Sequence, residues 1–175
     1  MEEKSSKLGW VLFAIAGCGC LLVGTAVLGV VAAITIPNFV DAREKAKQKR
    51  TIADVRTVGT AWMSWLTDQV IGAEDSTALG PGEISAEELR ELLVPVYISE
   101  VPASDGWGHP LELTLVESRE GFELPTLRIR SPGRDGVFEA VPDPEAPGSY
   151  DAIDYDRDIV WQDGFFIQFP GGAPP

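Results

Sequence analysis

The residues best suited to chemistry are the carboxylates of an acidic, turn-rich segment at positions 139–158. The acidic side chains of this segment are Glu139, Asp143, Glu145, Asp151, Asp154, Asp156 and Asp158. Ca²⁺ takes roughly six to eight oxygen ligands, several of them carboxylates or backbone carbonyls, so oxygen-rich loops suit it. The spacing is not that of an EF-hand. The segment is therefore either a Ca²⁺-binding loop or a solvated acidic loop.

Other kinds of chemical site have little support in the sequence. His109 is the only histidine, and no nucleophile or base is spaced so as to act with it. No phosphate-binding loop, zinc pattern or dinucleotide fingerprint is present. We therefore expect no catalytic residues, no organic cofactor and no enzymatic activity.

Charge is distributed unevenly along the chain. The total is −13 and residues 1–40 are neutral. Residues 41–56 hold six basic and three acidic side chains, a charge of +3, so residues 57–175 carry −16. A domain this acidic repels nucleic acid and suits solvent, divalent cations or a basic partner. We expect no nucleic-acid partner.

An uninterrupted apolar segment extends from Trp10 to Ile36. It contains no Asp, Glu, Lys, Arg, His, Asn or Gln. About 20 apolar residues in a helix span the hydrocarbon core of a bilayer, and a helix satisfies its own backbone hydrogen bonds there. A buried helix of a soluble protein would normally show a polar stripe. We therefore predict a transmembrane helix at residues 10–36, in contact with membrane lipid.

The segments on either side of the apolar run are polar. Residues 1–9 form a short lead, and residues 37–71 continue the helix beyond Pro37. In this continuation, spacings of three and four residues place one apolar stripe on a single face, formed by Val55, Val58, Trp62 and Trp65. The simplest interpretation is one long helix, roughly residues 8–71, whose first half lies in the membrane and whose second half packs against a domain.

Residues 72–170 are predicted to form that domain, and residues 171–175 a disordered tail. Ser85 and Glu88 form a capping box that begins a helix at 85–94. Leu111, Leu113 and Leu115 alternate with polar residues, as in a half-buried strand.

Further strands are predicted beyond that one. After a turn at 118–121, residues 122–130 form a second strand, which Pro125 places at an edge or at a bulge. Asp163-Gly164 connects a β-hairpin of residues 159–162 and 165–169. The predicted fold class is α+β, with the long N-terminal helix packed on a small antiparallel β-sheet.

Three segments occur in an order that is found in a known family. The first extends from Leu28 to Phe39 and includes Ile36-Pro37-Asn38. The second is Val101-Pro102 with Asp105-Gly106-Trp107-Gly108, and the third is Ser131-Pro132-Gly133-Arg134-Asp135-Gly136 with the later Asp158-Ile159. Together they resemble the type IV pilin-like proteins, most closely the major pseudopilins of type II secretion systems.

The resemblance implies a structural subunit or accessory of a secretion or pilus-like assembly in the bacterial inner membrane. Its partners would be other pilin-like subunits, secretion-system proteins or further copies of the chain. The family binds Ca²⁺ in the corresponding loop. By position Asp135 and Asp158 match family residues, and Asp154 and Asp156 lie near them in the sequence, so these four are the predicted metal ligands.

The chain departs from the family at the start of the apolar segment. Prepilins have a Gly before the cleavage point and a Glu a few residues later, and alignment places Ile15 and Cys20 at those positions. The alternative prediction is therefore an uncleaved, membrane-anchored periplasmic binding module on a pilin-like scaffold. The basic residues at 43–56 favour the cytoplasm for the domain. The resemblance implies the opposite orientation, with residues 1–9 in the cytoplasm and the domain in the periplasm, and we follow the resemblance.

Overall fold

The computed structural model describes residues 3–72, 79–117 and 125–171, with side-chain surroundings from residue 23 onwards. The chain divides into two units, Met1–Arg43 and Glu44–Pro175. The predicted turn at 118–121 and all but the first residue of the predicted tail at 171–175 lie outside the described residues.

Helix α1 extends from Glu3 to Gly72 with Pro37 in its interior, so the single long helix predicted from the sequence is confirmed. Residues 10–40 of the helix contain no charged side chain. The part in the second unit turns a stripe toward the core, in which Val55, Val58 and Trp62 are fully buried and Trp65 nearly so. The three- and four-residue spacing correctly identified this face.

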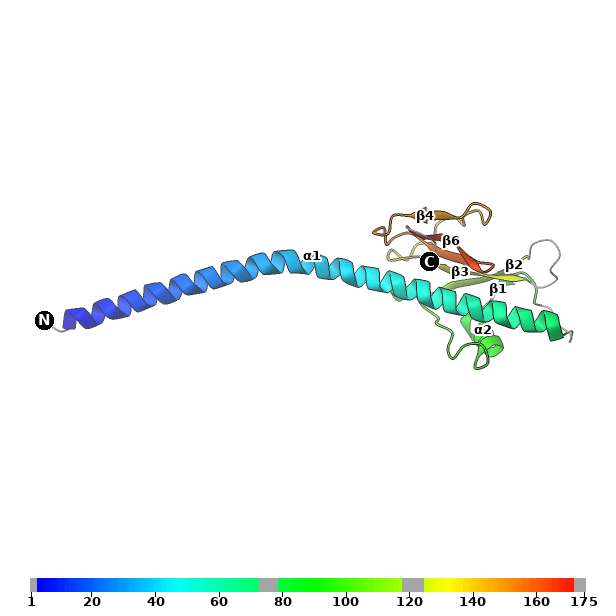
Figure 1. Ribbon diagram of the computed structural model, residues 1–175, viewed down its shortest axis with the longest axis horizontal. Helices are drawn as coiled ribbons and strands as arrows, with labels where there is room; N and C mark the ends of the chain where they lie inside the picture. Colours follow the sequence, from blue (N-terminus) through cyan, green and yellow to red (C-terminus); the bar gives the residue numbers. More distant parts are fainter. Residues whose placement is uncertain (1–2, 73–78, 118–124, 172–175) are drawn as a thin grey trace. The chain divides into compact units, whose positions relative to one another are not determined.

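The second unit combines the end of α1 with a short helix and a sheet, which makes the fold α+β (Figure 1). Helix α2 covers Ala86–Leu93, and its N-cap is the predicted capping box. The Ser85 hydroxyl accepts a hydrogen bond from the Glu88 amide at 3.2 Å, and the Glu88 carboxylate accepts one from the Ser85 amide at 2.8 Å.

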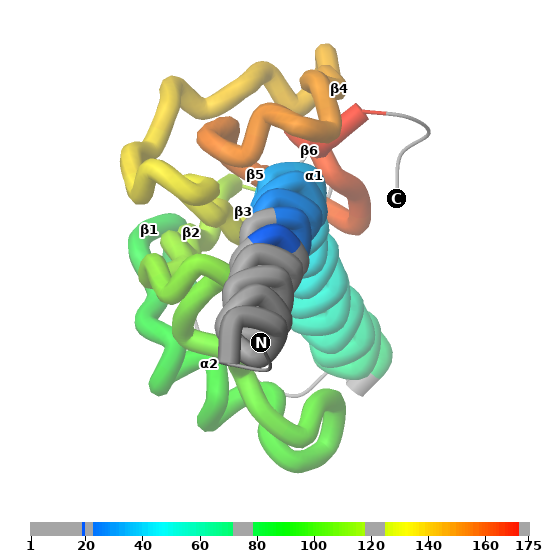
Figure 2. The backbone as a smooth tube through the Cα atoms, turned by 90° about the vertical axis from the view of Figure 1, so that its left-hand side faces the viewer, coloured from blue at the N-terminus to red at the C-terminus, as the bar shows by residue number. Residues whose placement is uncertain are grey.

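Six strands form one sheet in the order β1-β2-β3-β5-β6-β4. Figure 2 shows β1 and β2 at one end of the sheet and β4 and β6 at the other. The strands are β1 Gly82–Glu83, β2 Glu112–Val116, β3 Thr126–Ser131, β4 Gly148–Tyr150, β5 Ile159–Gln162 and β6 Phe165–Pro170.

Two expectations about the sheet were wrong. The strand predicted at 122–130 is β3, and residues 122–124 of that range lie outside the described part. It is neither at an edge nor bulged, because it lies between β2 and β5 and its register with both is unbroken. Pro125 precedes the strand and so removes no donor from its ladder. The sheet is also not purely antiparallel, because β4 pairs with β6 in parallel. The chain reverses direction twice between these two strands, before and after β5, which restores the original direction.

The predicted hairpin is confirmed. Asp163 and Gly164 connect β5 to β6, and both have positive φ, 54° and 93°. Positive φ at both central residues is what a type I′ turn needs, and its twist matches that of the paired strands.

The core of the second unit lies between α1, α2 and the sheet. Leu89 and Leu93 of α2 are fully buried, as are Leu127 and Ile129 of β3. Trp161 of β5 approaches α1 at Gly59, where an added Cβ would lie 2.5 Å from the indole ring. The helix therefore needs a residue without a side chain at this contact.

Candidate functional site

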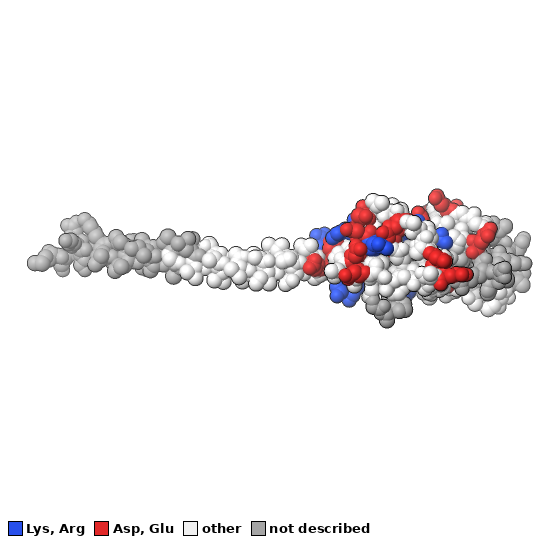
Figure 3. Space-filling model, turned by 90° about the horizontal axis from the view of Figure 1, so that it is seen from above, with Lys and Arg blue, Asp and Glu red and all other residues white. Residues whose placement is uncertain are grey.

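The first candidate surface is the apolar part of α1 at residues 23–40. Every side chain in this stretch is exposed, and its large apolar side chains are 50–69% accessible. It contains no charged residue and appears white in Figure 3, in contrast to the charged second unit. Helix α1 is long and apolar enough to cross a membrane. Exposed apolar surface on this scale marks a site of contact with lipid or with another apolar helix.

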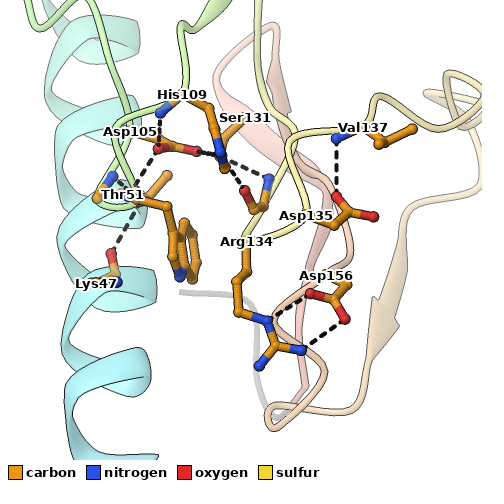
Figure 4. A network of polar contacts seen from close by, with 12 residues as sticks. Lys47, Thr51, Asp105, His109, Ser131, Arg134, Asp135, Val137 and Asp156 are labelled. Atoms are coloured by element: carbon orange, nitrogen blue, oxygen red, sulfur yellow. Dashed lines mark hydrogen bonds and ion pairs between the residues drawn. The ribbon is translucent and has the colours of Figure 1, made fainter. Parts of the chain in front are cut away.

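The second candidate is a polar junction centred on Asp105, which is buried (Figure 4). Its Oδ1 atom accepts hydrogen bonds from the backbone amides of Trp107 and His109, both at 2.9 Å. Its Oδ2 atom accepts one from the Ser131 hydroxyl at 2.7 Å. The carboxylate therefore holds the loop at 105–109 in a tight turn and joins it to the end of β3.

The junction is also attached to α1. The Thr51 hydroxyl donates to the Lys47 carbonyl at 3.0 Å and accepts from the Gly106 amide at 2.9 Å. A Cβ on Gly106 would collide with the Lys47 carbonyl, so the loop can approach the helix backbone only because residue 106 is glycine. The indole of Trp107 donates to the Glu44 carboxylate at 2.6 Å.

That hydrogen bond affects the acidity of Glu44. Burial by itself would raise the pKa of Glu44, but the hydrogen bond from Trp107 and the ammonium group of Lys47 together hold it below its usual value. Glu44 is therefore a charged anchor between α1 and the loop.

His109 and Ser131 both contact this network, but not in the arrangement of a catalytic triad. The Ser131 hydroxyl donates to the Asp105 carboxylate, not to an imidazole nitrogen. Nδ1 of His109 lies 2.8 Å from the Gly133 carbonyl, which can only accept, so Nδ1 carries the proton. With its hydroxyl proton directed to a carboxylate, Ser131 is not activated as a nucleophile by His109.

The four predicted Ca²⁺ ligands occupy three different environments. Asp156 forms a two-point ion pair with Arg134, with oxygen–nitrogen distances of 2.7 and 2.8 Å. The hydrogen bond from the guanidinium lowers the pKa of Asp156. A carboxylate that already has both oxygens on a cation is poorly placed to ligate a second one.

Asp158 is fully buried against a different arginine. Its Oδ2 atom accepts from Arg130 at 2.9 Å and from the Glu139 amide at 3.1 Å, while its Oδ1 atom has no hydrogen-bond partner. Burial raises the pKa of Asp158, and this outweighs the opposing effect of the Arg130 guanidinium.

Asp135 and Asp154 are exposed. One Asp135 oxygen accepts a hydrogen bond from the Val137 amide at 3.0 Å, which closes a local turn. Within residues 3–72, 79–117 and 125–171, no three His, Cys, Asp or Glu side chains are grouped so that they could hold a metal ion. The Ca²⁺ site remains a prediction, and these side chains do not fit it well: two are committed to arginines, and the single unpartnered oxygen of Asp158 falls far short of the set that Ca²⁺ needs.

Sequence reasoning missed the arginines that accompany the acidic segment. Arg130 and Arg134 flank the Ser-Pro-Gly turn at 131–133, and Arg157 lies within the acidic segment. Arg157, isolated among carboxylates, was the available signal, because buried or crowded charges tend to be paired.

Comparison with protein-family models, with curated proteins and with solved structures finds no match to this chain.

Proposed function

We propose that the chain is a single-pass structural protein of the bacterial inner membrane, a pseudopilin-like subunit or accessory of a type II secretion or type IV pilus-like assembly. Its second unit would lie in the periplasm. It would act by packing its apolar helix against lipid and against the helices of other subunits, and not by catalysis. The observation that carries this proposal is the exposed, charge-free surface of α1 at residues 23–40.

Helix packing is compatible with the composition of this surface. Gly24 and Gly29 have open space where a Cβ would lie, so a second helix could approach the backbone closely at these positions. In a bilayer, association between helices depends on such close contact because lipid tails provide no hydrophobic drive for it.

The pilin-like part of the proposal is supported by where the resembling segments lie in the fold. Two of them, 101–108 and 131–136, meet at the Asp105 junction through Ser131. The junction also attaches them to α1 at Thr51. These two segments are thus parts of a single contact between helix and domain, as expected if they specify a common scaffold.

The proposal is tested by cysteine crosslinking in membranes. In a chain with Cys18 and Cys20 replaced by Ser, single cysteines are introduced at each position from 27 to 34. A helix that packs against copies of itself should crosslink with a period of about 3.6 residues. Glu91→Cys, on the exposed side of α2, is the control and should remain uncrosslinked. Equal crosslinking at all positions from 27 to 34 would argue against a packed subunit. So would the absence of crosslinks in membranes that also contain the partner assembly.

The orientation of the second unit relative to the membrane is tested by adding protease to membrane vesicles that contain the chain. A periplasmic domain is digested when the outer face of the inner membrane is exposed, and it is protected in inverted vesicles. The opposite result would favour the cytoplasmic side, as the basic residues at 43–56 suggest.

The second candidate function, an uncleaved membrane-anchored binding module, is favoured by one specific observation. Ile15 and Cys20 stand where prepilins carry the Gly and Glu used in processing and assembly. The intact mass of the chain extracted from membranes separates the two candidates. Retention of residues 1–9, together with the absence of periodic crosslinks, would favour the binding module.

A further inference from the structure

Three ion pairs link two stretches of chain, residues 130–139 and residues 156–158, at the two ends of the acidic segment. Arg130 pairs with Asp158 at 2.9 Å, and Arg134 pairs with Asp156 at 2.7 Å. Arg157 pairs with Glu139 at 3.2 Å. Each pair joins residues 130–139 to residues 156–158, so together they hold the two stretches side by side.

Each of these arginines also lies over an aromatic ring. Arg130 is 4.9 Å from the centroid of Phe138, Arg134 is 5.9 Å from that of Tyr155, and Arg157 is 5.9 Å from that of Tyr150. A guanidinium can donate hydrogen bonds to a carboxylate from its edge while its face lies against an aromatic ring. The two contacts together restrict its position. Three such placements fall within residues 130–157, whereas significant cation–π pairs occur roughly once per 70–80 residues.

The backbone of residues 133–134 packs closely against that of residues 155–157. The Arg134 amide donates to the Tyr155 carbonyl at 2.8 Å. Gly133, with φ of 73°, approaches so closely that an added Cβ would lie 2.7 Å from the same carbonyl. The Tyr155 carbonyl is therefore already bonded to a backbone amide, and the space beside it is filled by protein.

We propose that these six residues form an arginine clasp that takes the place of a bound cation in the acidic loop. The clasp consists of Arg130, Arg134 and Arg157 with Asp158, Asp156 and Glu139. The guanidinium groups neutralise carboxylates and tie the two stretches together, so the loop keeps its structure without a divalent cation. This inference is independent of whether the chain assembles as proposed above.

The test is hydrogen exchange of the full chain in detergent, followed in peptides covering residues 132–140 and 150–158. Exchange in the unaltered chain should be the same in excess EDTA and in millimolar Ca²⁺. Arg134→Gln should speed exchange in both peptides by about threefold, in EDTA and in Ca²⁺ alike, since an exposed ion pair contributes only modestly to local stability.

Arg90→Gln is the matched control. It removes an arginine from the Arg90–Glu87 pair on α2, which has the same 2.7 Å distance but, among the residues that the structure describes, no aromatic ring against its guanidinium. It should leave both peptides unchanged. Arg130→Gln should have the largest effect, because its partner Asp158 is buried; if that variant fails to fold, Arg134→Gln still decides the matter.

Two results would overturn the clasp. One is faster exchange of the unaltered chain in EDTA than in Ca²⁺, which would show that a divalent cation holds the loop. The other is exchange in Arg134→Gln that cannot be distinguished from that of the unaltered chain.

Discussion

Helix α1 has two surfaces that are built by different rules, although they belong to one continuous element. In residues 23–40 every side chain is exposed and none is charged. In residues 44–72 apolar side chains alternate with polar ones, and one stripe is buried. A stripe is what a helix needs when one side faces a core and the other faces water. An apolar surface on all sides is what it needs when the surroundings are themselves apolar.

Two stretches of one helix can both be rich in apolar residues and still differ in how those residues are arranged around the helix. The second stretch makes its own water-free environment with α2 and the sheet, whereas the side chains of the first are exposed. Substitutions of the same kind should therefore have different effects in the two stretches.

Trp62→Ala should have the largest effect. Trp62 is fully buried and its ring lies 4.8 Å from that of Trp65. Removing a buried aromatic leaves a cavity and costs about 3–5 kcal/mol of unfolding free energy. Denaturant unfolding of the full chain in detergent, followed by circular dichroism, measures it. Val31→Ala, in the exposed stretch, should leave the same transition in place; comparable losses from both variants would contradict the distinction between the two surfaces.

Val23→Lys should have the next largest effect, and on a different property. Val23 is exposed and lies at the centre of the predicted membrane segment 10–36, and a lysine near the centre of a membrane helix costs about 2.5–3.5 kcal/mol of insertion free energy. The fraction of chain that resists alkaline extraction from membranes should fall, with no change in the unfolding of the domain. Val70→Lys is the counterpart in the second stretch, since Val70 is also exposed. It should insert like the unaltered chain, and equal extraction of both variants would contradict the assignment of residues 10–36 to the membrane.

A smaller effect is expected where glycine is replaced. Gly59→Ala would place a Cβ 2.5 Å from the Trp161 ring, so the helix or the strand must move. Overpacking of this kind costs about 1–3 kcal/mol. Gly29→Ala meets no atom and should be neutral toward unfolding of the domain. Thermal unfolding of the two variants side by side is the measurement. A neutral Gly59→Ala would show that Trp161 can be displaced at no cost.

The parts of the fold that sequence predicted are those with local signals. The buried stripe from Val55 to Trp65, the capping box at Ser85 and the hairpin at Asp163-Gly164 each depend on residues within a few positions of one another. Helix periodicity, capping and turn geometry act over that range, so the amino acids alone carry the information.

The parts that were missed depend on distant residues. Strand β1 has only Gly82 and Glu83, too few for a periodic pattern, and it exists because β2 pairs with it. β4 likewise depends on β6, which lies beyond β5 in the chain. The same applies to the candidate site, because counting carboxylates found Asp156 but not its partner Arg134. A contact across 22 positions is decided by the fold and not by the spacing.

The smallest predicted effect concerns pH, which can act only outside the apolar stretch because residues 10–36 contain no ionisable side chain other than two cysteines. Burial raises the pKa of Asp158 above its usual value of 3.8. The native state then binds this proton more readily than the unfolded state, so the contribution of Asp158 to stability falls as pH rises from 3.8 through the raised pKa. The hydrogen bond from Arg134 lowers the pKa of Asp156, so its contribution is present above 3.8 and is lost as pH falls through the lowered pKa.

We therefore expect the contributions of Asp158 and Asp156 to the unfolding free energy to change with pH in opposite directions. Each contribution is the difference between the unaltered chain and the variant Asp158→Asn or Asp156→Asn, measured against pH. Subtracting the Asp158→Asn curve should leave a term that decreases with pH above 3.8, whereas subtracting the Asp156→Asn curve should leave one that increases with pH below 3.8. Two terms of the same sign would mean that the two carboxylates share one environment, as ligands of a common cation would. Opposite signs would support two separate arginine pairs, because burial outweighs the arginine at Asp158 whereas the hydrogen bond from Arg134 outweighs burial at Asp156.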